Sequence, residues 1–109
     1  MNDETSPCRL LLSACADVAT AERIAAALVE EGLAACVTLL PGARSVYRWH
    51  GAIEHAEECV LLIKARADDY PALERRLLAL HPYDVPELLA VPVLGGNPAY
   101  LAWLEARGV

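Results

Sequence analysis

Residues 81–87, with the sequence HPYDVPE, bring an imidazole, a phenol and two carboxylates into one short segment. Its prolines, Pro82 and Pro86, disfavour helix and interior strand at their positions and stiffen the backbone. These side chains offer acid–base chemistry, metal ligation and ligand recognition. A helix-like stretch precedes the segment and a strand-like run follows it, so we expect a functional site at this corner of the fold.

Catalysis has little support elsewhere in the sequence. Cys36 and His81 could form a thiolate–imidazole pair, but a core cysteine and a helix-capping histidine are the simpler interpretation. Asp84 and Glu87 could act as a carboxylate pair, although an aspartate before Val-Pro is more often a turn former. The chain has no G-x-S-x-G motif, no glycine-rich phosphate loop and no H-E-x-x-H motif. We therefore expect a protein that is not an enzyme.

Metal binding is a second possibility. His50 and His55 flank the turn residue Gly51, and His81 is distant in sequence. Cysteine, histidine and glutamate side chains suit copper or zinc. None of the four cysteines forms a C-x-x-C pair, so no local spacing defines a metal site, and the cysteines are most simply buried thiols. A site would have to be assembled in three dimensions or between subunits.

A small-ligand cleft is a third possibility. Aromatic and cationic side chains at Tyr47, Trp49, Lys64, His81 and Tyr83 could converge on a small anion or a nucleotide-like ligand. The alternative is that Tyr47 and Trp49 anchor a subunit interface, while Lys64 is a solvated surface charge.

Composition limits the partners. The formal net charge of −6 makes nucleic acid and anionic membranes poor partners, and the absence of Phe argues against an RNA-binding sheet. No apolar run approaches the length of a transmembrane helix. The first residues are acidic and lack the features of a signal peptide, so we expect the cytoplasm. We interpret residues 1–8 as a flexible tail and residues 9–109 as one domain.

Three helices are expected. Asp17 is a plausible N-cap of the first helix, and Gly32 ends it. Asp68 or Asp69 should cap the second helix, and Asn97 should cap the third, with a proline at its first position. The expected buried face of the third helix consists of Tyr100, Trp103 and Leu104.

The strands are defined by apolar runs and by turn residues. Pro41-Gly42 predicts a kink or bulge, and Gly51 predicts a chain reversal. Pro92 lacks a ladder donor, so it predicts an edge strand or a bulge. An acidic interruption is expected at residues 54–58. The expected strands are residues 9–15, 33–40, 45–49, 58–66 and 88–94, with 45–49 continuing the second strand.

The resulting order, βαββαβ with an extra C-terminal helix, predicts an α+β, ferredoxin-like fold. Two helices should cover one face of the sheet. The other face would expose apolar residues in a chain that is 56% hydrophobic, which predicts association. The long second and third strands suit pairing with a neighbouring subunit.

The chain resembles the CutA family, the divalent-cation tolerance proteins, over most of its length. The resemblance is carried by six segments that occur in the family's order: residues 33–37 (LAACV), 41–42 (PG), 45–51 (SVYRWHG), 61–64 (LLIK), 81–87 (HPYDVPE) and 96–103 (GNPAYLAW).

This resemblance implies a ferredoxin-like homotrimer held by long hairpin strands and related in architecture to the PII signalling proteins. It also implies an association with tolerance to copper and other divalent cations. Copper binding is proposed for some members of the family, and no enzymatic activity is established for it. Cys36 matches a strand cysteine suspected of contacting metal, and Lys64 matches a strand lysine. Ser13 stands where some members have a further cysteine, with Cys15 shifted along the same strand.

Our leading hypothesis is therefore a trimeric cytoplasmic protein of divalent cation tolerance, with Cys36, His81 and Glu87 as candidate ligands for copper or another divalent cation. The rival hypothesis is a PII-like sensor that binds a small anionic metabolite in intersubunit clefts lined by Trp49, Lys64 and Tyr83 and signals to a partner protein. A purely structural trimer is a third possibility.

Overall fold

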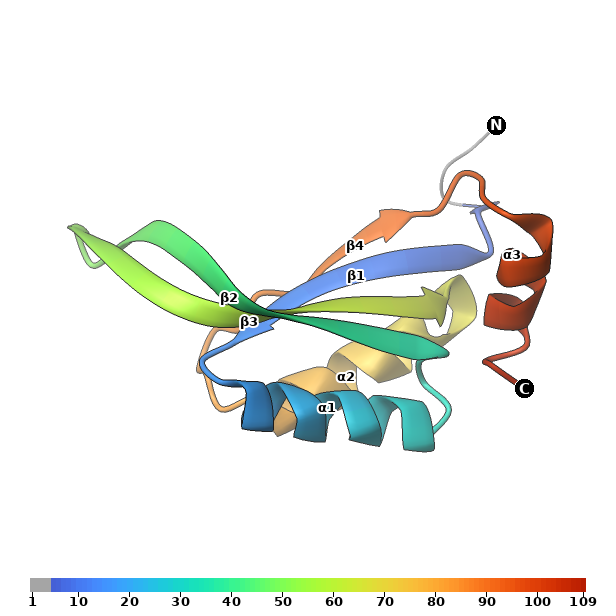
Figure 1. Ribbon diagram of the computed structural model, residues 1–109, viewed down its shortest axis with the longest axis horizontal. Coiled ribbons are helices and arrows are strands. Elements are labelled where there is room, and N and C mark those ends of the chain that lie inside the picture. Colours follow the sequence, from blue (N-terminus) through green and yellow to red (C-terminus); the bar gives the residue numbers. More distant parts are fainter. Residues whose placement is uncertain (1–4) are drawn as a thin grey trace.

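A computed structural model of the chain describes residues 5–109, which form a four-stranded sheet and three α-helices (Figure 1). The order of the elements is the predicted one, and no helix in this range is long and apolar enough to cross a membrane. The elements are β1 (Cys8–Cys15), α1 (Val18–Glu30), β2 (Cys36–Trp49), β3 (Ala52–Arg66), the 3-10 turn η2 (Ala67–Asp69), α2 (Tyr70–Leu80), β4 (Leu89–Pro92) and α3 (Pro98–Glu105).

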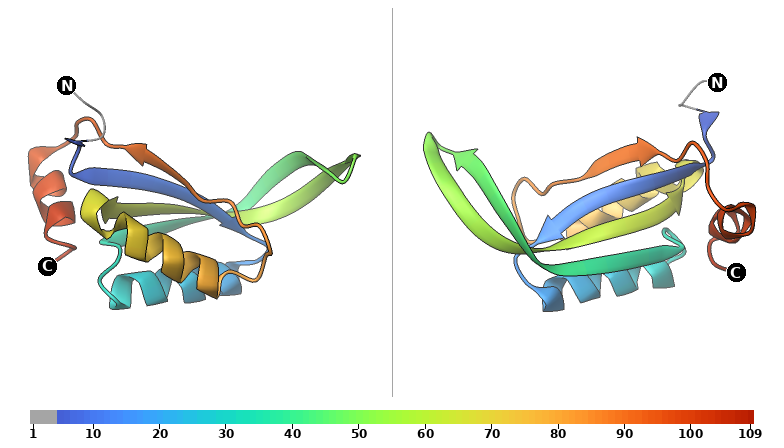
Figure 2. Two further views of the ribbon diagram at one scale, coloured as in Figure 1. Left: turned by 180° about the vertical axis from the view of Figure 1, so that it is seen from behind. Right: turned by 45° about the horizontal axis from the view of Figure 1, so that its top comes forward.

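The sheet is antiparallel, with the strand order β2-β3-β1-β4. Helices α1 and α2 lie side by side on one face, and α3 lies at one end (Figures 1 and 2). No helix of residues 5–109 lies over the opposite face (Figure 2). The strand β4, which contains Pro92, is at the edge of the sheet as predicted, where a missing donor breaks no central ladder.

The core lies between the sheet and the two helices. Alternate residues of β3 point into it, as predicted, with Cys59, Leu61, Ile63 and Ala65 all buried. The helices complete the core with Ala21, Ile24 and Leu28 of α1 and Leu73 and Leu77 of α2. The predicted N-caps of α1 and α3 are confirmed. The Asp17 carboxylate accepts a hydrogen bond from the N–H of Thr20, and the Asn97 side-chain oxygen accepts one from the N–H of Ala99.

The hairpin of β2 and β3 extends well beyond the core (Figure 1). Its reversal occurs at His50 and Gly51, whose φ angles are +48° and +81°. Two successive positive φ angles match the twist of the flanking strands. The predicted bulge is confirmed, because the register shifts between Leu40 and Ala43. The predicted interruption at residues 54–58 is wrong: β3 continues through it, since β2 supplies a paired backbone partner at every step.

Three local expectations differ from the structure near the chain ends. Asp69 makes no cap hydrogen bond and instead pairs with Arg107 at 2.8 Å, which ties η2 to the C-terminal segment. On α3 only Leu104 is buried, whereas Tyr100 and Trp103 are exposed. Ser6 is buried and donates to the carbonyl of Val93. Of the predicted tail, residues 1–4 lie outside the described range, Ser6 is packed against the domain, and Cys8 already belongs to β1.

Candidate functional site

The proline-framed connector joins α2 to β4 and is fixed to the body of the domain at both ends. The N–H of His81 donates to the carbonyl of Leu77 at 2.9 Å, which closes the last turn of α2. The hydroxyl of Ser13 on β1 donates to the carbonyl of Glu87 at 2.7 Å. The connector is therefore a preformed wall rather than a loose loop.

His81 is only 6% exposed, and both of its ring nitrogens have partners. The N–H of Tyr83 donates to Nδ1 at 3.1 Å, so the ring proton lies on Nε2. Nε2 then donates to the carbonyl of Ala14 at 2.8 Å, with the Cys15 sulfur 3.6 Å away. His81 ends α2 and links the connector to β1. It would have to give up one of these contacts to bind a metal ion.

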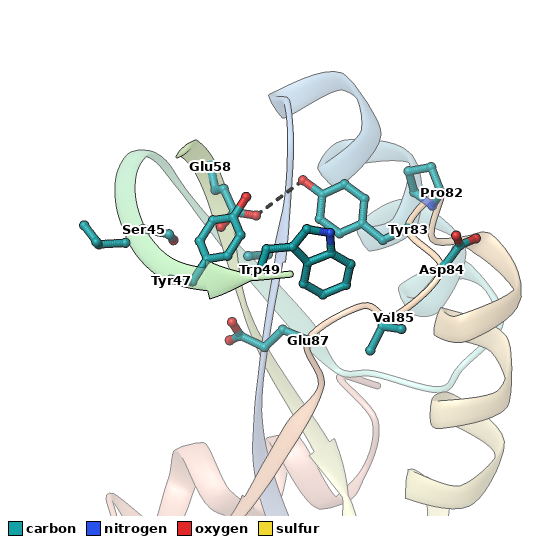
Figure 3. A pocket seen from close by; sticks show the side chains of 11 residues that line it. Ser45, Tyr47, Trp49, Glu58, Pro82, Tyr83, Asp84, Val85 and Glu87 are labelled. Carbon is teal, nitrogen blue, oxygen red and sulfur yellow. Dashed lines mark hydrogen bonds between the residues drawn. The ribbon is translucent and has the colours of Figure 1, made fainter. Parts of the chain in front are cut away.

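A cavity of about 810 Å³ lies between the connector and the projecting part of the hairpin (Figure 3). It brings together three of the candidate residues, Trp49, Tyr83 and Glu87, although they come from β2 and from the connector. The lining consists of Ala14, Ser45, Val46, Tyr47, Trp49, Glu58, Pro82, Tyr83, Asp84, Val85 and Glu87.

Aromatic rings and carboxylates dominate this lining. Tyr47, Trp49 and Tyr83 supply the rings, while the carboxylates come from Glu58, Asp84 and Glu87 (Figure 3). The hydroxyl of Tyr83 donates to Glu58 Oε2 at 3.4 Å. Burial and then the negative charge of Glu58 raise the pKa of the Tyr83 phenol, so the phenol keeps its proton at neutral pH. The cavity therefore favours positive charge over negative charge.

Lys64 lies elsewhere. Its Nζ donates to Thr38 Oγ1 at 2.6 Å and lies 3.8 Å from the sulfur of Cys36. Six positions of β3 separate it from Glu58, or about 20 Å of extended chain. Within one chain, Lys64 is therefore separated from the cavity that Trp49 and Tyr83 line, whereas the predicted cleft between subunits stays a prediction.

The candidate metal ligands do not meet within one chain. Cys36 pairs in register with Lys64, whereas His81 contacts Cys15, which pairs with Cys59. The five residue steps along β3 from Cys59 to Lys64 span about 17 Å. Within residues 5–109, no group of three or more His, Cys, Asp or Glu side chains is arranged to hold a metal ion. The described part of one chain therefore offers no such site by itself.

Glu58 was missed as a site residue because sequence reasoning placed it in an acidic interruption. The available signal was strand alternation: Glu58 points away from the core because Cys59 points into it. Its contact with Tyr83 joins two elements that are far apart in the sequence, and no local spacing encodes that contact.

The buried thiol beside His81 gives a testable pH dependence. Burial, followed by the neighbouring groups Cys59, Asp17 and Glu58, raises the pKa of Cys15 to about 11 from its ordinary value of 9.0. Between these two values the unfolded chain loses the thiol proton and the folded chain keeps it, so the free energy of unfolding falls as pH rises. We expect Cys15→Ala to show a smaller fall in Tm from pH 8 to pH 10.5 than the parent chain.

The matched control is Leu12→Ala, which removes packing from the same strand and leaves the thiol in place. It should lower Tm at every pH and keep the parent's slope. A Cys15→Ala variant with the parent's slope would show that this thiol does not govern the alkaline loss of stability.

The chain is similar to known proteins along a range that includes the hairpin, the connector and the cavity. A family model described as CutA1 divalent ion tolerance protein matches residues 9–107. The divalent-cation tolerance protein CutA of Pectobacterium atrosepticum is 50% identical to the chain over 97 residues, which are 89% of this chain and 88% of that protein. The matched range includes the hairpin, the connector and every residue of the cavity.

Solved structures agree with the fold. The crystal structure of CutA from Xylella fastidiosa matches with a TM-score of 0.91 and 50% identity, over 95% of this chain and 100% of that one. The periplasmic divalent cation tolerance protein CutA from Archaeoglobus fulgidus matches with a TM-score of 0.88 and 30% identity, over 94% of this chain and 99% of that one.

Proposed function

The chain belongs to the CutA1 family of divalent ion tolerance proteins, and we propose that it acts in tolerance to divalent cations as a homotrimer. The observation that carries the proposal is the family match over residues 9–107. The relative from Pectobacterium atrosepticum bears the name divalent-cation tolerance protein, and it is 50% identical over 89% of this chain.

The trimer is supported by the shape and exposure of the sheet. In the part of the chain that the structure describes, one face has no helix over it, and the hairpin projects beyond the core (Figure 2). Exposed apolar side chains lie on the hairpin and the edge strand, at Val46, Ile53, Leu89 and Val91. A monomer would leave this surface in water, whereas association would bury it. We propose that ferredoxin-like subunits assemble through the hairpins, in an architecture like that of the PII proteins.

Copper is the divalent cation that we propose to test first, because cysteine and histidine are ligands that copper accepts readily. Cys36, His81 and Glu87 are separated within one chain, so a copper ion bound by them would lie between subunits. The proposal includes no catalytic reaction. The anion-binding alternative loses support from the cavity, whose lining includes three carboxylates and no Lys, Arg or His.

We propose the cytoplasm as the location of this protein. All four cysteines, which lie in the described part of the chain, are free thiols, and free thiols suit a reducing compartment. The matched protein from Archaeoglobus fulgidus is described as periplasmic, so cell fractionation is a direct test. Recovery in the periplasmic fraction would contradict the proposal.

The functional experiment is growth of a bacterial strain that lacks its own CutA protein and carries this chain on a plasmid. We expect growth at higher copper concentrations than with the empty vector, with zinc and nickel tested in parallel. Unchanged growth limits for all three cations, at confirmed expression, would refute the tolerance role.

Assembly and metal binding are measured on the purified protein. Light scattering should give about three times the 11.7 kDa of one chain. Calorimetric titration with copper should then show stoichiometric binding that weakens in Cys36→Ala. A monomer would refute the trimer, and binding retained unchanged in Cys36→Ala would remove Cys36 from the ligand set.

A further inference from the structure

We propose that the cavity between the hairpin and the connector binds a small organic ammonium cation, of which a quaternary ammonium is the simplest example. The cavity is formed within one chain, by β1, β2, β3 and the connector. This inference therefore goes beyond cation tolerance, and it requires no bound metal; the cavity and the exposed fractions on which it rests are those of one chain.

Three aromatic rings form the apolar part of the cavity. Tyr47 and Trp49 come from alternate positions of β2, so their side chains share one face of the hairpin. Tyr83 comes from the connector and lies across the cavity from them (Figure 3). Trp49 is 50% exposed, and both tyrosines are also exposed. Ring faces that remain open to solvent around a cavity can contact a cation through their negative π-surfaces.

The charged part of the cavity has a single sign. Glu58, Asp84 and Glu87 line it together with the rings, and no basic residue does. Glu58 accepts one hydrogen bond, from the Tyr83 hydroxyl, through Oε2. Asp84 and Glu87 are exposed and have no salt bridge among residues 5–109. The lining thus combines cation–π surfaces with carboxylates, which is the combination that recognises alkylated ammonium groups.

Other ligand classes fit this lining less well. A small anion would face three carboxylates and no cationic donor, because Lys64 is bonded to Thr38 at the other end of β3. A divalent metal ion lacks a suitable ligand group in the described part of the chain. A neutral apolar molecule would desolvate the carboxylates without compensation. An organic ammonium cation satisfies both the rings and the carboxylates, and about 810 Å³ is ample for one.

The walls are held in place before any ligand arrives. The ring of Tyr83 packs against the buried ring of His81 with a centroid separation of 4.7 Å, and its backbone N–H bonds to His81 Nδ1. Ser13 fixes the connector at Glu87. Because the connector is already ordered, binding of the cation carries little entropic cost for ordering a loop.

The test compares choline with 3,3-dimethyl-1-butanol, which has nearly the same shape and no charge. Both are titrated into the full-length protein in its own oligomeric state, without added metal, and followed by calorimetry and by tryptophan fluorescence, to which Trp49 and Trp103 both contribute. We expect choline to bind about tenfold more tightly than the neutral alcohol. Glu87→Gln and Trp49→Leu should each weaken choline binding severalfold, while Lys64→Ala, which changes a charge outside the cavity, should leave it unchanged.

Three results would overturn the proposal: no choline binding in the millimolar range, equal binding of the two compounds, or choline binding that Glu87→Gln and Trp49→Leu both leave intact. Glu87→Gln preserves the size of the side chain, and far-UV circular dichroism checks that each variant remains folded. The copper growth experiment is independent of this one, so either proposal can fail without the other.

Discussion

Replacement of His81 by alanine should lower the free energy of unfolding by about 3 kcal/mol, because it removes the residue that joins α2, the connector and β1. The imidazole donates to the carbonyl of Ala14 and accepts from the N–H of Tyr83. Without it, the Ala14 carbonyl loses its side-chain partner in a buried position, and the ring leaves a void beside the Cys15 sulfur. Both effects destabilise the folded chain.

Urea unfolding followed by circular dichroism measures this effect at a fixed protein concentration. The control is His50→Asn, which changes an exposed histidine whose positive φ angle asparagine tolerates. This control should stay within about 0.5 kcal/mol of the parent. If His81→Ala instead keeps the parent's stability and loses copper binding, His81 is a metal ligand and the structural role assigned to it here is wrong.

Local signals in the sequence were sufficient for most of the fold. Asp17 and Asn97 cap helices because a short polar side chain at that position bonds a free backbone N–H, and neighbouring residues alone decide this. The alternation in β3 placed Leu61 and Ile63 in the core for a similarly local reason. Asp69 also precedes a helix and was predicted as a cap, but its carboxylate pairs with Arg107 instead. Arg107 is far along the chain, and no local pattern connects it to Asp69.

The candidate site could be predicted only in part. The connector was recognised from its prolines, and Trp49 and Tyr83 do line one cavity. Lys64 and Glu58 lie on the same strand, and sequence alone did not reveal which of them reaches the connector. That depends on the register of the sheet and on the side of β1 along which the connector returns. The sign of the charge in the cavity was therefore a result of the structure.

Replacement of both Val46 and Ile53 by aspartate should convert the proposed trimer into monomers of 11.7 kDa. These residues are 65% and 55% exposed in the single chain. Val46 pairs with His55 and Ile53 with Arg48, so the two apolar side chains are diagonal neighbours on one face of the hairpin. By alternation, Tyr47 and Trp49 belong to the other face.

The expected effect is large because a buried carboxylate without a partner is costly, and each trimer would have to bury six of them at its interfaces. Light scattering measures the mass, and far-UV circular dichroism checks that the chain remains folded. The control is Val18→Asp, which places the same charge on a valine that is 39% exposed. Val18 belongs to α1, one of the two helices that cover the other face of the sheet. The mass of this control variant should stay at three times that of one chain.

The single variant Ile53→Asp separates two roles of the hairpin, because Ile53 does not line the cavity, whereas Val46 does. If it is monomeric and still binds choline, the cavity functions within one chain, and the trimer is needed only for cation tolerance. A double variant whose mass remains three times that of one chain would exclude this face of the hairpin from the interface. The subunits would then have to meet through other exposed apolar residues, of which Leu89 and Val91 on the edge strand are the next to substitute.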